Sequence, residues 1–183
     1  IKKIENNTYF DDYWQNLNYV KPLGNLLKKL KIDNPRKKHI KLIKKINLKR
    51  NSVAVHIRVY TPVRNEDKYH GNLEKEYFDK SIKKIKKKIK NPFFFIFSNN
   101  YSIIKKKIDL NDKEYEVVRN FRDFEDLISF STCKHQIISN STFSWWAAWL
   151  NTNKFKIVIY PQKWFSSKKI PSNLIPKGWQ KIK

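Results

Sequence analysis

The chain has 183 residues, a length that fits one domain of ordinary size. Hydrophobic residues make up 40% of it and aromatic residues 15%, enough to bury a core, so the composition excludes disorder over most of its length. No apolar run reaches the roughly 18 residues of a transmembrane helix, and the single cysteine, Cys133, excludes an internal disulfide. The chain contains no Met and begins at Ile1, so we interpret it as a piece of a longer protein.

The formal net charge is +24 at pH 7, and such a surface attracts polyanions, anionic membranes and phosphorylated ligands. Most of the basic residues are Lys, a solvated point charge, rather than Arg, whose planar fork binds phosphates and bases. This balance disfavours nucleic-acid binding and leaves peripheral membrane contact through the basic surface open. The densest basic stretch, 83–90, carries Ile82, Ile85 and Ile89 at helical spacing, which predicts a helix with a solvated basic face.

Residues 1–50 combine aromatic side chains without a clear period and a basic segment, 26–48, that is predicted to be helical with a break at Asn34-Pro35. We interpret them as the helical and aromatic remnant of an N-terminal part. After them, short apolar runs predict strands at 52–58, 93–97, 115–118, 136–139 and 156–160, and helical patterns predict helices at 73–90, 101–108, 123–131 and 142–150. The third of these helices is predicted to begin with Asp123 as N-cap and Asp126 in the reciprocal capping-box position.

The strands are apolar throughout and alternate with helices. This pattern is typical of a parallel sheet that is buried on both faces. No internal repeat or low-complexity linker divides residues 52–160. The sequence therefore predicts one α/β domain over residues 51–183, with a Rossmann-like parallel sheet and helices on both faces.

Polar residues follow three of the predicted strands, at the carboxyl ends where open parallel sheets bind their ligands. Should the strand order bring them together, they form a crevice with one fixed cation, several hydroxyls and amides, and a helix N-terminus. Such a crevice suits a diphosphate, because backbone N–H groups and a bidentate Arg both bind anionic oxygens. The candidates are His56, Arg58, Ser98, Asn99, Asn100, Asn140, Ser141, Thr142 and, within the last helix, Ser144.

Each candidate also has a purely structural interpretation. His56 is compatible with a hydrogen-bonded core histidine, Arg58 with a partner of some carboxylate, and Ser141 with a helix cap. Other chemistries fit less well. Three glycines are too few for a dinucleotide-binding or P-loop motif, and the four His are dispersed, so we expect no metal site.

One stretch of the chain carries a specific resemblance. Residues 133–151, CKHQIISNSTFSWWAAWLN, closely resemble the C-terminal signature of glycosyltransferase family 11, the α-1,2-fucosyltransferases. Shorter segments along nearly the whole chain support it: Tyr13-Trp14-Gln15, Val55-His56-Ile57-Arg58 as the start of an HxRRGD motif, Tyr69-His70-Gly71, Phe97-Ser98-Asn99-Asn100 as an FSDD-like strand end, and Ile159-Tyr160-Pro161.

The resemblance implies the donor-binding half of a GT-B-type enzyme. Such an enzyme is inverting and metal-independent, needs no cofactor, and moves L-fucose from GDP-fucose to the 2-hydroxyl of a galactose-terminated glycan. Arg58 would neutralise the diphosphate and His56 would orient Arg58 or a donor hydroxyl. Ser141 and Thr142 would hold phosphate oxygens, and Asn99 or Asn100 would face the guanine or ribose.

Two departures from the family motifs keep other hypotheses open. Val59-Tyr60-Thr61 stands where the family has Arg-Gly-Asp, and Asn99-Asn100 stands where it has a pair of carboxylates. A degenerate relative that binds a nucleotide sugar or glycan without turnover is the first alternative, and a basic nucleic-acid-binding protein is the weaker second. The absence of a secretory segment and the lone cysteine favour a cytoplasmic location, at the inner membrane face where glycans are assembled.

Overall fold

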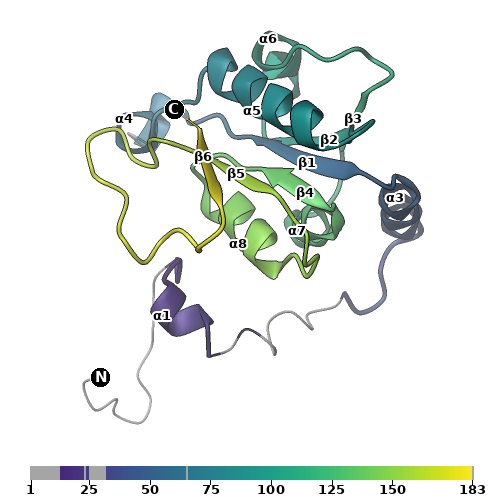
Figure 1. Cartoon of the computed structure of the whole chain (residues 1–183), viewed down its shortest axis with the longest axis horizontal. Helices are drawn as coiled ribbons and strands as arrows, with labels where there is room; N and C mark the ends of the chain where they lie inside the picture. The colour runs from purple at the N-terminus through teal and green to yellow at the C-terminus, as the bar shows by residue number, and fades with distance from the viewer. Residues whose placement is uncertain (1–12, 23, 25–31, 65, 183) are drawn as a thin grey trace.

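The structure is a computed structural model that describes residues 13–22, 24, 32–64 and 66–182. Its centre is a sheet of six strands in the order β3-β2-β1-β4-β5-β6, in which every neighbouring pair is parallel (Figure 1). The strands are β1 (Ser52–Ile57), β2 (Phe93–Ser98), β3 (Tyr115–Val117), β4 (His135–Ile137), β5 (Val158–Pro161) and β6 (Gln180–Ile182). This order is that of the doubly wound Rossmann fold, so the predicted fold class is confirmed.

Helices cover both faces of the sheet, because successive strand residues point to opposite sides and both sides are apolar. Val53 and Val55 of β1 pack under α5 (Lys75–Lys88) and α6 (Ile104–Lys107), whereas Ala54 faces the opposite layer. That opposite layer contains α3 (Lys37–Leu48), α7 (Asp123–Thr132) and α8 (Thr142–Leu150) (Figure 1). The remaining short helices are α1 (Leu17–Val20), η1 (Pro62–Arg64), α4 (Glu66–His70) and η2 (Tyr101–Ile103).

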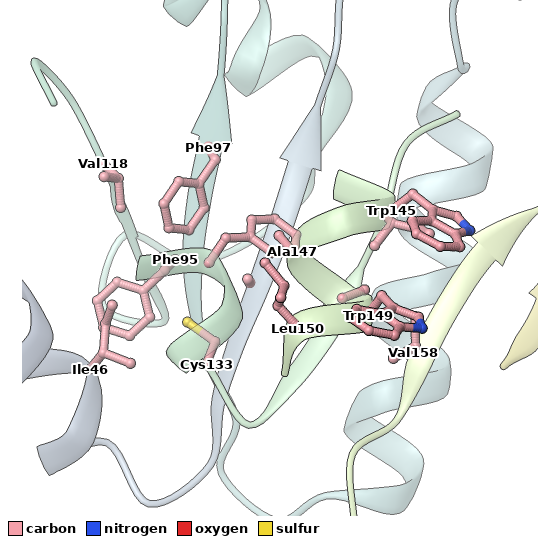
Figure 2. Close-up of a cluster of buried hydrophobic side chains, with 14 of the residues drawn as sticks. Ile46, Phe95, Phe97, Val118, Cys133, Trp145, Ala147, Trp149, Leu150 and Val158 are labelled. Atoms are coloured by element: carbon pink, nitrogen blue, oxygen red, sulfur yellow. The ribbon is translucent and has the colours of Figure 1, made fainter. Parts of the chain in front are cut away.

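The aromatic helix α8 anchors the core on its side of the sheet. Trp145 is fully buried and stacks parallel to Trp149 at a centroid distance of 6.4 Å. Figure 2 shows these two rings beside Val158 of β5, with Ala147 and Leu150 turned towards the middle of the sheet. The indole N–H of Trp145 donates to the carbonyl of Leu174 at 2.7 Å, so the C-terminal loop is fixed to the helix. As a result, the start of α8 has a defined position beyond the carboxyl end of β4.

The start of α7 differs from the prediction. Its N-cap is Arg122, and Asp123 is the first helical residue. The backbone N–H of Arg122 donates to Oε2 of Glu125 at 2.9 Å, so Glu125 takes the place in the capping box that was expected of Asp126. A second contact explains the choice, because Arg36 of the segment before α3 donates to the same buried carboxylate. This bond lowers the pKa of Glu125 to about 2.

Asp126 has a different environment. Burial, and then the charges of Asp123 and Glu125, raise its pKa to about 7, with Lys38 acting in the opposite direction. A carboxyl that holds its proton more tightly when folded destabilises the fold as the pH rises from about 4, its unfolded pKa, through 7. We therefore expect Asp126→Asn to raise the melting temperature by a few degrees at pH 8 and to leave it unchanged at pH 4. Thermal denaturation against pH tests this. Asp109→Asn is the exposed control, and an equal gain at both pH values contradicts the assignment.

Some predictions fall partly outside the described residues. Helix α3 begins after the predicted break at Asn34-Pro35, but residues 26–31 of the same predicted helical segment lie outside the described part of the chain, as do the aromatic residues before Tyr13. The division into residues 1–50 and 51–183 stays a prediction. Strand β6 was not predicted, and neither were η1 and α4, which lie between β1 and α5.

Candidate functional site

The polar strand ends meet at the centre of the sheet. Strands β2, β1 and β4 are neighbours, and the chain continues from β1 towards one edge and from β4 towards the other (Figure 1). This is the topological switch point, the place at which open parallel sheets bind their ligands. The three polar segments that follow β1, β2 and β4 are therefore brought together. The sequence predicted a shared site on the condition that the strand order brings these segments together, and the observed order does so.

Side chains from neighbouring strands fix the backbone that carries Arg58. The N–H of Arg58 donates to Oγ of Ser139 at 3.2 Å, and that hydroxyl donates to the carbonyl of His56 at 2.6 Å. The next residue, Val59, is held on both sides by one amide. Its N–H donates to Oδ1 of Asn99 and its carbonyl accepts from Nδ2 of Asn99, each at 2.9 Å. Asn99 thus continues the β-sheet pairing by one residue through a side chain.

A second amide repeats this arrangement one residue further along. The N–H of Tyr60 donates to Oδ1 of Asn72 at 2.7 Å, and its carbonyl accepts from Nδ2 of Asn72 at 3.0 Å. The Tyr60 hydroxyl donates to the carbonyl of Asn140 at 2.6 Å, which ties the end of β1 to the end of β4. Each of residues 58–60 is therefore fixed by at least one side chain from elsewhere in the chain. The position of the Arg58 side chain follows from this anchored backbone.

The Arg58 guanidinium lies over the Tyr60 ring, with its carbon 5.2 Å from the ring centroid. The other partner of that ring is His70, stacked at 4.6 Å with an interplanar angle of 13°. Arg58 forms no ion pair with any of the acids that the structure describes. The structural interpretation in which Arg58 neutralises a carboxylate of this chain thus finds no support among the described residues. The cation remains available for an anionic ligand.

His56 is buried against Phe143 of α8 at 5.0 Å and Phe130 of α7 at 6.2 Å between ring centroids. Burial, and then the charge of Arg58, lower its pKa to about 3. Its imidazole is therefore neutral throughout the physiological range, which makes it unsuited to general acid or base catalysis near pH 7. Its Nδ1 has no hydrogen-bond partner among the described residues. We therefore expect His56 to help position its neighbours rather than to transfer a proton.

The residues after β2 mainly hold the loop in shape. The hydroxyl of Ser98 donates to the carbonyl of Ile57 at 2.7 Å and accepts from the N–H of Asn100 at 3.1 Å. Oδ1 of Asn100 accepts from the N–H of Ser102 at 3.1 Å and caps η2. The two-sided contact of Asn99 with Val59 has the same character. Their predicted contacts with guanine or ribose stay predictions.

The residues after β4 differ in the hydrogen bonds of their side chains, although Asn140, Ser141 and Ser144 are all buried. Nδ2 of Asn140 donates to the carbonyls of His70 and Trp164, at 2.7 and 3.2 Å, and Oγ of Ser144 donates to the carbonyl of Ser139 at 3.0 Å, so both side chains are committed to the fold. Ser141 is the N-cap of α8, but its side chain makes no capping hydrogen bond. The predicted alternative, that Ser141 merely caps the helix, is therefore not what the structure shows. Backbone N–H groups at this helix start remain for an anion.

Thr142, the first residue of α8, meets a segment that is distant in sequence. Its hydroxyl donates to Oε1 of Gln15 at 3.0 Å. The sequence did not assign a role to Gln15, Tyr60, Asn72 or Ser139. Ser and Asn side chains give no periodic signal, and their partners are backbone atoms that only the folded chain places beside them.

Two further observations limit the classes of site. Within the described ranges, no helix is both long and apolar enough to cross a membrane. Within the same ranges, no three His, Cys, Asp or Glu side chains gather as metal ligands would. The expectation of metal-independent chemistry stays untested.

Comparison with known proteins gives a consistent result. The family described as Glycosyl transferase family 11 matches residues 2–183. The chain is 35% identical over 134 residues to "O-antigen biosynthesis glycosyltransferase WbnK" of Escherichia coli, covering 70% of this chain and 44% of that protein. It is 34% identical over 138 residues to "Alpha-1,2-colitosyltransferase" of Escherichia coli, covering 72% of this chain and 48% of that protein. The chain thus spans about half the length of these relatives, and no solved structure matches it.

Proposed function

The chain belongs to glycosyl transferase family 11, and from this premise we propose that it carries the donor-binding half of a GT-B-type fucosyltransferase. The proposed reaction moves L-fucose from GDP-fucose to the 2-hydroxyl of a galactose-terminated glycan, with inversion and without a metal ion. The observation that supports it best is the anchored Arg58, which has no acidic partner among the described residues and follows β1 at the switch point. A diphosphate is the ligand that this position suits.

The chemistry assigned to these residues is electrostatic. As the bond between sugar and phosphate breaks, negative charge accumulates on the leaving GDP, and a fixed cation stabilises that charge in place of a metal ion. The backbone N–H groups at the start of α8 add the positive end of a helix dipole. His56 stays neutral and uncharged beneath Arg58, so it adds no competing positive charge to the crevice.

The relatives support a glycan acceptor without identifying it for this chain. One is named for O-antigen biosynthesis and the other for α-1,2 transfer of colitose, so both names describe the assembly of glycosidic bonds. We take the α-1,2 linkage from this likeness and the GDP-fucose donor from the motif resemblance. The galactose of the acceptor rests on the motif resemblance.

A second candidate function has its own observation. Val59 and Asn99, two of the positions that depart from the family motifs, are hydrogen-bonded to each other. A protein that retains the donor site but lacks a second Arg is expected to bind the nucleotide sugar without transferring it. Binding together with measured turnover separates the two functions.

Calorimetric titration with GDP, with UDP as the competing nucleotide and EDTA present throughout, tests the proposal. We expect GDP to bind at least ten times more tightly than UDP and EDTA to have no effect. Equal affinity for the two nucleotides, or binding to neither, contradicts the donor assignment. Release of GDP from GDP-fucose in the presence of lactose then distinguishes transfer from binding alone.

We also propose that the exposed basic side of α5 contacts an anionic membrane surface, which agrees with work at the inner membrane face. Lys83 and Lys87 are exposed on this helix and pair with no acid in the described part of the chain. A lysine near an anionic bilayer contributes about 1 kcal/mol. Lys83→Gln with Lys87→Gln is therefore expected to reduce sedimentation with phosphatidylglycerol vesicles about tenfold or more, and Lys154→Gln with Lys163→Gln to reduce it less. Equal losses in the two variants indicate only a general charge effect.

A further inference from the structure

A cavity of about 310 Å³ opens beside the first turn of α8. Four separate parts of the chain form its walls: the segment before α1, the end of α4, the start of α8 and the loop after β5. Thr142, which belongs to the predicted phosphate site, lines it together with Gln15, Tyr69, His70, Trp164 and Phe165. The cavity is linked to Arg58 through Tyr60, whose ring contacts both the Arg58 guanidinium and the ring of His70, a lining residue.

The walls are held together by hydrogen bonds between their backbones and side chains. The N–H of Ser166 donates to the carbonyl of Tyr69 at 2.9 Å, which joins the loop after β5 to α4. On the other side, the indole N–H of Trp146 donates to the carbonyl of Tyr13 at 3.1 Å. Trp14, which lies in sequence between the lining residues Tyr13 and Gln15, has φ 55°. This is a left-handed conformation that a bulky residue keeps only where its surroundings enforce it. The cavity is therefore formed before any ligand arrives.

The lining has the chemistry of a site for a neutral polyol. No Asp, Glu, Lys or Arg is among the described residues that line it. The rings of Tyr69 and Phe165 meet edge to face at 5.2 Å, and Tyr69 keeps 44% of its surface exposed. The negative face of such a ring attracts the C–H groups on the less polar side of a pyranose. The Nζ of Lys168 lies over the Tyr69 ring, 5.1 Å from its centroid, but no charged side chain is among the described residues that line the cavity itself, and such a lining favours a sugar over a phosphate.

One polar group in this wall lacks a partner. Nε2 of Gln15 is buried and donates to no acceptor in the described structure, although Oε1 of the same side chain accepts from Thr142. A buried donor without an acceptor destabilises the fold, so a ligand oxygen at this point would be favourable. Hydroxyls of a sugar ring supply such oxygens. The amide is fixed in orientation, because its other end is occupied by Thr142.

The volume limits what can enter. Pockets for complete drug-sized ligands range from about 300 to 1,000 Å³, so this cavity lies at the lower end and suits one ring rather than a whole nucleotide sugar. Other cavities are larger: those of about 600 and 610 Å³ lie at the opposite end of the strands, one of about 560 Å³ lies along the loop after β5, and one of about 360 Å³ lies beside α3. None of these is lined by Tyr69, His70 or Thr142. They lack the ring platform and the connection to Arg58.

We propose that this cavity holds the sugar ring of the nucleotide-sugar donor, with Tyr69 and Phe165 as the platform and Gln15 as a hydrogen-bond donor to a ring hydroxyl. The proposal rests on the proposed function, since it places the ring next to a diphosphate held by Arg58 and α8. The transferred sugar would thus lie between the first residue of α8 and the end of α4. Gln15 and Tyr69 become determinants of which sugar is accepted.

Saturation-transfer NMR with GDP-fucose tests the proposal. Protons of the fucose ring and its methyl group are expected to receive saturation from the protein, as is H8 of the guanine. In Tyr69→Ala and in Gln15→Met, the ratio of sugar to guanine saturation is expected to fall at least threefold. Phe155→Ala, which removes an exposed ring elsewhere, is the matched control and is expected to keep the wild-type ratio.

The outcomes separate the cavity from the function. Saturation of H8 without saturation of the sugar overturns the cavity assignment and leaves donor binding intact. An unchanged ratio in both cavity variants also overturns it, and the retained H8 signal shows that these variants are folded. Absence of saturation on every proton overturns the donor function, and the cavity proposal with it.

Discussion

Arg58→Gln is expected to weaken GDP binding about 100-fold and to abolish transfer. The side chain is the cation at the switch point that pairs with no acid in the described structure, and its backbone is anchored through Ser139. A bidentate guanidinium makes two charge-assisted hydrogen bonds to a diphosphate, each of about 1.5 kcal/mol or more. Their loss accounts for the expected change in affinity.

The loss in transfer is expected to exceed the loss in binding. The charge on GDP grows as the glycosidic bond breaks, so the interaction with Arg58 is stronger in the transition state than in the bound donor. Arg58→Lys keeps the charge but not the planar fork, and an intermediate result is expected. kcat and KM measured with GDP-fucose, together with calorimetry with GDP, separate the two effects.

Arg50 is the matched control, because it precedes β1 at the opposite end of the strand that Arg58 follows. Arg50→Gln removes the same charge and is expected to change GDP affinity by less than twofold. If Arg58→Gln and Arg50→Gln bind GDP equally well, the anion site lies elsewhere. A thermal denaturation curve for each variant shows that the comparison is made between folded proteins.

The fold was predictable because its signals are periodic. The run that forms β1 is buried at every position and is apolar except at Ser52 and His56, and α8 begins at Thr142 and ends at Leu150 as predicted. β6 gave no such signal, since Gln180–Ile182 has three residues and only one of them is apolar. Its place in the sheet depends on pairing with β5, which is visible only in three dimensions.

The beginning of α7 shows a different limit. Asp123 is a good N-cap by residue type, but the cap is Arg122, because Glu125 is held by Arg36 from a segment that lies far away in sequence. Local propensity favours Asp123 as the N-cap, but the tertiary contact between Arg36 and Glu125 places the N-cap at Arg122. Errors of one residue at helix ends are therefore expected wherever a long-range ion pair forms there.

The location of the candidate site could be predicted from the sequence, but the role of each side chain in it mostly could not. The carboxyl ends of β1, β2 and β4 follow from the strand pattern, and the sheet order brings them together. Sequence alone could not show that the Asn99 amide binds the backbone of Val59. In the sequence the two residues are only separate departures from the family motifs. The structure joins them as a hydrogen-bonded pair.

That pair leads to the second large prediction. Asn99 uses both ends of its amide, one as an acceptor for the N–H of Val59 and one as a donor to its carbonyl. A carboxylate keeps the first bond but replaces the second with repulsion between two oxygens. Asn99→Asp is therefore expected to loosen the segment that carries Arg58 and to weaken GDP binding about tenfold at pH 8.

The sign of the pH dependence distinguishes this mechanism from general damage. When the new carboxyl is protonated it donates again, so the bond to the Val59 carbonyl returns as the pH falls towards about 4, the usual pKa of Asp. The ratio of wild-type to Asn99→Asp affinity for GDP is expected to shrink towards one between pH 8 and pH 4.5. Asn99→Ala has no group to protonate, and its deficit is expected to stay constant over the same range.

Asn111→Asp supplies the matched control. Oδ1 of Asn111 accepts from the N–H of Lys113 at 3.0 Å, and a carboxylate accepts this bond equally well, so the same substitution adds the same charge without removing a donor. Little change in GDP affinity is expected at any pH. If Asn99→Asp shows a deficit that does not shrink on acidification, ionisation of the new carboxyl is not its cause, and the proposed loss of the bond to the Val59 carbonyl is contradicted. If its affinity matches the wild type at pH 8, the backbone of Val59 does not need this amide to hold Arg58 in place.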